Sequence, residues 1–188
     1  MPDTFSWKSV SGVGLALLGL SCAASCASPG GNREPRTAYL RTDSTEIAVT
    51  SHPNVHSYSG AIGFVLINNG DKPVSRSGCS SPTGPDLEKK VNGRWVPAIY
   101  PINALCRRVP DFSWESGPTY PRALGFNVFE RGHGLPELLV DSINGVYRLH
   151  WILTEGRKAD ATGARKIEAV SNEFRMKLRP ATDAEVSH

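Results

Sequence analysis

Hydrophobic and polar residues alternate along most of the chain after residue 38. In the segment 144–155, for example, Arg148 and His150 separate large apolar residues. Successive side chains of a β-strand point to opposite faces, so this period of two predicts strands with one face in the core. The positions expected to face the core are Ile47, Val49, Ile62, Phe64, Leu66, Leu124, Phe126, Val128, Tyr147, Leu149, Trp151, Leu153, Phe174, Met176 and Leu178.

Turn-forming residues separate these strands. Asn92-Gly93 divides the segment 87–100 into two short runs, and this pair favours the positive φ angles of a two-residue hairpin turn. Helical spacing is rare. Its best candidate, Leu135–Ile143, is short and fits a strand equally well. Three segments with many turn residues predict long loops: Ser77–Asp86, Pro101–Tyr120 and Gly156–Glu168.

About seven short strands, each with one apolar face, predict two antiparallel sheets packed face to face. The 188 residues are 39% hydrophobic and 21% charged, a composition typical of soluble globular proteins. We therefore expect an all-β sandwich with long loops over residues 38–180, followed by a disordered tail at 181–188.

The first residues have a different pattern. Lys8 precedes the apolar run Val13–Leu20, and small residues dominate from there to Ser28. This layout is typical of a secretory signal peptide, and the run is too short to span a membrane. An amphipathic or buried helix is the alternative. The tract Ala27–Thr37 has the proline, glycine and polar content of a flexible tether.

Two cysteines follow the apolar run, and the segment resembles a bacterial lipoprotein signal. Small residues precede Cys26, as in the family, whereas a bulky Leu20 lies near Cys22. The resemblance implies a signal peptide at 1–25, lipidation of Cys26 (alternatively Cys22) and a lipid-anchored tether at 26–37. The protein would then lie on the periplasmic or outer face of a bacterial envelope. Ordinary cleavage, giving a soluble secreted protein, is the alternative.

The segment "DSINGVYRLHW" resembles the tyrosine corner of immunoglobulin-like sandwiches. The resemblance implies an immunoglobulin-like fold in which the Tyr147 hydroxyl bonds to upstream backbone. The antibody branch of this family has a cysteine two residues after the tyrosine, where this chain has Leu149. The inter-sheet disulfide of that branch is therefore not expected.

Cys79 and Cys106 are predicted to form a disulfide, because an exported protein meets an oxidising compartment. Both lie in loop-like sequence on either side of the Asn92-Gly93 hairpin. Closing a loop of this size stabilises by about 3–4 kcal/mol in the chain-entropy model. A pair of free thiols is the alternative.

Residues with catalytic or metal-binding chemistry are present but scattered. His52 and His56 are four residues apart in loop-like sequence, and His133 lies between Glu130 and Glu137. A histidine with carboxylates can form an acid–base site, but exposed loops often collect such residues. No phosphate-binding, dinucleotide-binding or metalloprotease motif occurs. We therefore predict no catalytic residues, no cofactor and no metal site.

Three aromatic residues, Phe112, Trp114 and Tyr120, lie in the longest predicted loop. Loops on a rigid sandwich often bind partners, and aromatic residues can anchor them. The alternative is that these residues form a small core of the loop.

We expect a non-enzymatic cell-envelope lipoprotein whose module binds or supports another envelope protein. The mild formal charge of +3 and the absence of a dense basic stripe argue against nucleic acid as a partner. Two other functions remain as alternatives. One is an inhibitor or accessory protein of a secreted enzyme, and the other is a hydrolase or metal-dependent enzyme.

Overall fold

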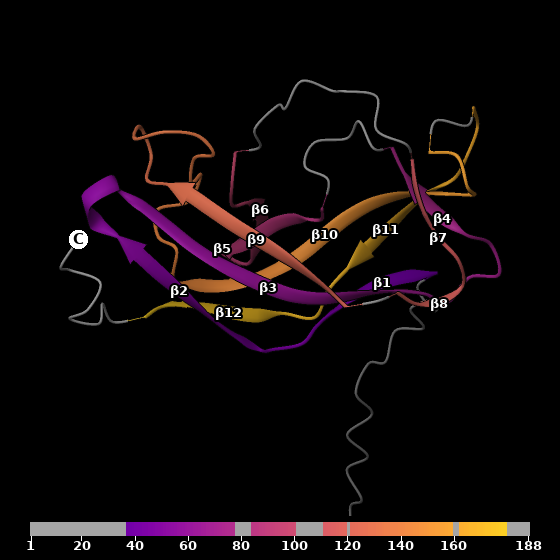
Figure 1. Ribbon diagram of the computed structural model, residues 1–188, viewed down its shortest axis with the longest axis horizontal. Helices are drawn as coiled ribbons and strands as arrows, with labels where there is room; N and C mark the ends of the chain where they lie inside the picture. Colours follow the sequence, from indigo (N-terminus) through magenta and orange to yellow (C-terminus); the bar gives the residue numbers. More distant parts are fainter. Residues whose placement is uncertain (1–36, 78–83, 101–110, 120, 160–161, 180–188) are drawn as a thin grey trace, which may run out of the picture. The chain divides into compact units, whose positions relative to one another are not determined.

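Two layers of strands form the fold, each built around one long strand, β3 or β10 (Figure 1). The computed structural model describes residues 37–77, 84–100, 111–119, 121–159 and 162–179. All of them belong to the unit Glu34–His188. Its elements are β1 (Ala38–Thr42), β2 (Glu46–His52), the 3-10 helix η1 (Pro53–Val55), β3 (Ser57–Asn68), β4 (Val74–Arg76), β5 (Asp86–Val91), β6 (Arg94–Pro97), β7 (Phe112–Trp114), β8 (Gly117–Pro118), β9 (Arg122–Phe129), β10 (Gly145–Glu155), β11 (Lys166–Val170) and β12 (Phe174–Leu178).

The first layer is centred on β3. Along one edge β3 pairs antiparallel with β9 and β8, and along the other it pairs with β1 and the end of β2. The register sets Ser57 opposite Phe129 at one end of the layer and Asn68 opposite Gly117 at the other. This long strand therefore connects two distant groups of loops.

The second layer is centred on β10. One edge of β10 pairs with β5 and β4, and the other pairs with β12 and β11. The short strands β6 and β7 extend this layer beyond β5 and β4. Every one of these pairings is antiparallel.

The strand β2 passes from one layer to the other. Its first residues, from Glu46 to Val49, pair parallel with β12, and Thr50 to His52 pair antiparallel with β3. The fold is all-β with two layers of strands, as predicted. Among the named strands of the described residues, the expectation of purely antiparallel sheets is wrong where β2 meets β12, because a strand that changes layers meets a new neighbour running in its own direction.

The hydrophobic core lies between the layers and uses the predicted faces of the central strands. Ile62 and Leu66 of β3 are buried, as are Leu149 and Leu153 of β10. Trp151 meets Phe64 edge-on across the layers, with ring centroids 6.4 Å apart. Among the positions predicted to face the core, Leu178 is 38% exposed, because β12 ends at this residue.

The predicted hairpin turn is confirmed. Asn92 and Gly93 have φ angles of 49° and 78° between β5 and β6, as a two-residue turn with positive φ requires. The segment 135–143 forms neither a helix nor a long strand. It makes isolated bridges through Glu137 and Leu138, and its Ile143 is buried.

Short strands occur where the sequence predicts loops. β7 and β8 lie within the predicted loop Pro101–Tyr120, and β11 begins before the end of the predicted loop Gly156–Glu168. β7 and β8, with three and two residues, are too short to display a period of two, and the five residues of β11 follow a run of polar and turn residues. They form here because the edges of β3, β4 and β10 supply backbone partners.

Tyr147 has the position that the tyrosine-corner resemblance implies. Its side chain is fully buried, and its hydroxyl donates a hydrogen bond of 2.8 Å to the carbonyl oxygen of Ile143. Burial raises the pKa of the Tyr147 phenol. Leu149, which replaces the cysteine of the antibody branch, is buried in the core.

Several sequence predictions lie outside the described residues. They are the signal peptide, the lipidated cysteine (Cys26 or Cys22), the disulfide between Cys79 and Cys106, the aromatic residue Tyr120 and the tail at 181–188. Within the described ranges, no helix has the length and apolar character needed to cross a bilayer.

Candidate functional site

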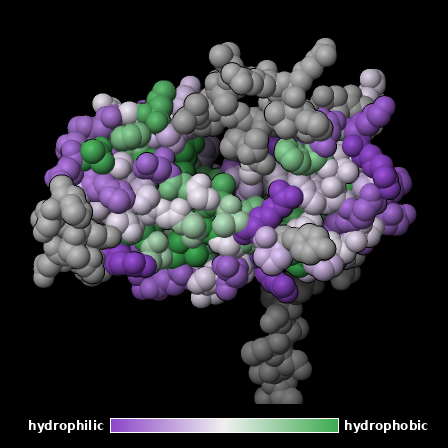
Figure 2. All heavy atoms as spheres, viewed as in Figure 1, coloured by the Kyte–Doolittle hydropathy of each residue, from purple (hydrophilic) through white to green (hydrophobic). Residues whose placement is uncertain are grey.

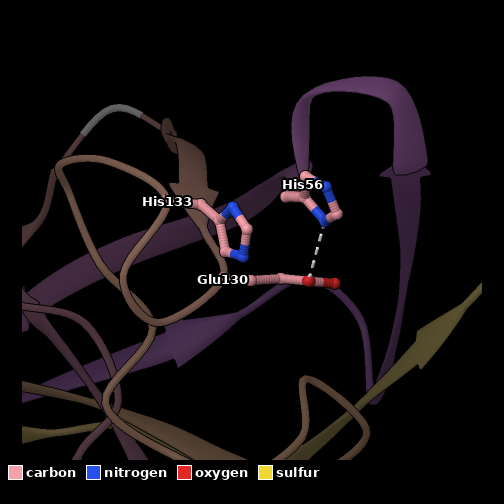
Figure 3. A group of neighbouring side chains, drawn as sticks. All are labelled: His56, Glu130 and His133. Carbon is pink, nitrogen blue, oxygen red and sulfur yellow. Dashed lines mark hydrogen bonds and ion pairs between the residues drawn. The ribbon is translucent and has the colours of Figure 1, made fainter.

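Two turns at one end of the β3–β9 pair bring His56, Glu130 and His133 together (Figure 3). His56 follows η1 and directly precedes β3, whereas Glu130 directly follows β9. Because β3 and β9 are antiparallel and Ser57 lies opposite Phe129, the residues beyond these two strand ends must meet. We call this group, together with Tyr58, the histidine cluster.

Backbone hydrogen bonds hold the cluster's main chain. The amide of Glu130 donates to the carbonyl of His56 at 2.8 Å, and the amide of His133 donates to the carbonyl of Glu130 at 3.0 Å. His56 itself adopts a left-handed conformation, with φ 50° and ψ 49°. The positions of the three Cα atoms are thus fixed by the fold, while the side chains of both histidines are exposed.

The side chains of the cluster contact one another directly. Nδ1 of His56 lies 3.3 Å from Oε2 of Glu130, and the rings of His56 and His133 stack with centroids 4.0 Å apart. The other carboxylate oxygen of Glu130 accepts a hydrogen bond of 2.7 Å from the Tyr58 hydroxyl. This bond, followed by the one with His56, lowers the pKa of Glu130, and the same bond raises the pKa of Tyr58.

The cluster differs from either grouping that the sequence offered. His52, four residues before His56, instead hydrogen-bonds through Nε2 to Ser59 Oγ at 2.8 Å. Glu137, expected near His133, pairs with Arg131 at 3.8 Å. The sequence therefore pointed to His56, Glu130 and His133 individually but not to their association. Their association would have followed from the sequence only if β3 and β9 had been paired with Ser57 opposite Phe129.

A second candidate region lies at the other end of β3. An open hollow of about 550 Å³ is lined by residues 113–116, 118–119 and 121–122. The Arg122 guanidinium lies 5.5 Å from the centroid of the Trp114 ring on this wall. Asn68, the last residue of β3, reaches the same segment through a 3.5 Å hydrogen bond from its side-chain amide to the Trp114 carbonyl.

The aromatic residues of this region are not all on the surface. Trp114 is buried, with its ring centroid 5.0 Å from that of Trp151, so the expectation that it is a surface anchor is wrong. It faces the core because its partner on β4 is the buried Val74. Phe112 stacks on Trp114 at 6.3 Å and remains 37% exposed. Phe112 is thus an exposed residue of β7, whereas Trp114 belongs to the core of the domain rather than to a separate small core of the loop.

The outer face of β10 carries a charged network between strands. Glu88 on β5 accepts a 2.6 Å hydrogen bond from Arg148 Nε and lies 3.2 Å from His150 Nδ1. The Arg148 guanidinium also lies 4.5 Å from the Trp95 ring centroid. The His150 side chain is only 18% exposed. These contacts tie β5 and β6 to β10.

The outer face of the β3–β9 pair is different in character. Figure 2 shows hydrophobic and weakly polar residues over this pair and hydrophilic residues around its periphery. The exposed residues here include Ala61, Ala123 and Gly125. Small uncharged side chains offer few groups for chemistry, so the histidine cluster and the hollow remain the two candidate sites.

Comparisons with known proteins add likenesses of fold. No protein-family model matches the chain, and no curated protein matches it significantly. Among solved structures, the chain is similar to target SoR45 of the Northeast Structural Genomics Consortium. That likeness has 11% identity and a TM-score of 0.40, and it covers 78% of this chain and 91% of that one.

The chain is also similar to the ASH/PapD-like domain 7 of human CEP192. The identity is 14% and the TM-score 0.27, over 84% of this chain and 97% of that domain. Both TM-scores lie below 0.5, so neither likeness carries an argument about function.

Proposed function

We propose that this protein is an exported, lipid-anchored component of a bacterial envelope and that its immunoglobulin-like domain is a non-enzymatic module that binds another envelope protein. The anchor is supported by the apolar run Val13–Leu20 and the small residues before Cys26. Lipid on this cysteine would hold the domain at a membrane surface while the domain itself stays in water.

The observation that carries the binding role is the hollow beside Trp114. Its wall combines an aromatic ring from the core with the Arg122 guanidinium, and Phe112 lies exposed next to that ring. Aromatic and arginine side chains on a rigid support are the residues that most often dominate protein–protein binding energy. β7 and β8 supply the support through their pairing with β4 and β3.

Site-specific photo-crosslinking in the producing cell tests the binding role. A photo-crosslinking amino acid replaces Phe112 in one variant and Ile152 in a matched control. Both residues are exposed hydrophobic side chains, at 37% and 49%, but Phe112 stacks on Trp114 beside the hollow, whereas Ile152 lies on β10 and does not line the hollow. We expect one discrete adduct from position 112 and none from position 152. Equal crosslinking at the two positions would contradict a specific binding surface.

Membrane fractionation tests the anchor. Cys26→Ser is expected to release the protein from the membrane fraction, whereas Cys22→Ser leaves it there with a diacylglyceryl group on Cys26 detectable by mass spectrometry. Release by Cys22→Ser alone would assign the lipid to the other cysteine. Retention of both variants and of the double variant would overturn the anchor.

A further inference from the structure

We propose that His56, Glu130 and His133 form a binding site for one divalent transition-metal ion of the Zn²⁺ type. One ligand atom from each residue lies within 4.8 Å of the others. Metal bonds of about 2.0–2.2 Å place neighbouring ligands of a tetrahedral ion about 3.3 Å apart. Closing the three side chains on an ion therefore requires movements of about 1–1.5 Å, which exposed side chains on a fixed backbone can make.

The donor set selects the class of metal. Two imidazole nitrogens and one carboxylate oxygen are ligands typical of zinc and its neighbours, whereas Ca²⁺ and Mg²⁺ prefer shells made of oxygen. The two imidazole rings are stacked, with an interplanar angle of 21°, and His56 points to the carboxylate (Figure 3). The three donors thus converge from the same side of two adjacent turns.

The surroundings of Glu130 favour this role. The Tyr58 hydroxyl bonds to Oε1 and leaves Oε2 directed at His56. Hydrogen-bonded partners of this kind orient metal-binding carboxylates and strengthen metal sites. The cation next in sequence, Arg131, is turned away, because its guanidinium donates to the carbonyl of Leu139 at 2.8 Å and pairs with Glu137.

Three protein donors leave a coordination position open. A four-coordinate ion would carry a water molecule there, or a donor from a bound partner. The ion would also join the turn before β3 to the turn after β9, two segments that are 74 residues apart in sequence. The site is separate from the hollow beside Trp114 and does not depend on the function proposed for it.

Titration of the purified full-length protein with Co²⁺ and Zn²⁺ tests the site. We expect a Co²⁺ absorption spectrum typical of four-coordination at one equivalent, competition by Zn²⁺, and shifts of the His56 and His133 ring signals in NMR spectra. His133→Ala should weaken this binding at least tenfold. His56→Asn should do the same, and asparagine keeps the left-handed backbone at this position.

The matched control is His52→Ala, which replaces an exposed histidine at the end of β2 that lies outside the cluster. It should bind the metals like the wild type, and all variants should unfold at the wild-type temperature without metal. Zn²⁺ should raise the unfolding temperature of the wild type and of His52→Ala, but not of the double variant His56→Asn/His133→Ala. Unchanged binding in the double variant, or ring signals that do not move in the wild type, would overturn the proposal.

Discussion

The two ends of β3 carry different kinds of site. At its start, His56, Glu130 and His133 of the histidine cluster lie on turns, whereas Tyr58 lies on β3 and packs against the core. At its end, Trp114 belongs to the core and to the wall of the hollow simultaneously. A strand of 12 residues separates them by roughly 35–40 Å, so the two sites are built on one rigid element without touching.

This difference determines how each end can be studied. Substitutions of His56 and His133 remove their imidazole nitrogens and leave the packing of the core almost intact, because both side chains are exposed. A substitution of Trp114 removes packing and binding surface together. The exposed neighbour Phe112 is therefore the informative position for binding at the aromatic end.

The largest effect is expected from Trp114→Ala. Removing a ring that contacts Trp151 in the core leaves a cavity, and we expect the free energy of unfolding to fall by about 3–5 kcal/mol. His133→Ala at the other end should change it by less than about 0.5 kcal/mol. Urea unfolding followed by tryptophan fluorescence and circular dichroism measures both. Similar losses of unfolding free energy in Trp114→Ala and His133→Ala would contradict the contrast between the two ends of β3.

A smaller loss is expected from Tyr147→Phe. The Tyr147 hydroxyl donates a hydrogen bond to the carbonyl of Ile143, the last residue of the segment 135–143. Leaving that buried carbonyl without its partner should cost about 1–2 kcal/mol of unfolding free energy. Tyr58→Phe is the matched control. It removes a hydroxyl bonded at the surface and should cost less than about 0.5 kcal/mol. A reversed order of the two losses would mean that the corner does not brace this segment.

The smallest effect is a change in titration at Glu130. Since the Tyr58 hydroxyl lowers the pKa of this carboxyl, Tyr58→Phe should raise it toward the ordinary value of 4.5. A lowered pKa in the folded state stabilises the fold above pH 4.5, and this contribution is lost as the pH falls through the folded value. The variant should therefore lose less stability on acidification.

Carbon-detected NMR of the Glu130 carboxyl in metal-free protein measures this pKa. Tyr147→Phe serves as the control, since Tyr147 bonds to backbone carbonyl oxygens of Ser142 and Ile143 rather than to Glu130. An identical Glu130 titration in the wild type and Tyr58→Phe would show that the hydroxyl does not act on the carboxylate.

The sequence predicted the strands whose alternation is long enough to show. The central strands around Ile62 and Leu149 have several consecutive pairs of inward and outward residues, and the structure buries the expected side. The turn at Asn92-Gly93 was equally readable, because its φ angles follow from the residues themselves. The short strands β7, β8 and β11 could not be predicted, because pairing with neighbouring strands, and not the local sequence, holds them in place.

The candidate sites divide in the same way. Trp114 follows the alternation of its short strand into the core, a position set by its pairing with β4. The histidine cluster needs the pairing of β3 with β9, which joins residues more than 70 positions apart. Each of its residues was visible in the sequence, but no local pattern connects them.

The sequence by itself thus determined the all-β class, the buried face of each long strand and the tyrosine corner, since these follow from the preferences of neighbouring residues. Only the tertiary structure decided that β2 changes layers, that Trp114 is buried and that His56 meets Glu130 and His133. Those outcomes depend on which strands pair. Pairing is selected by burial of the whole core at once, so it is a property of the folded chain rather than of any one segment.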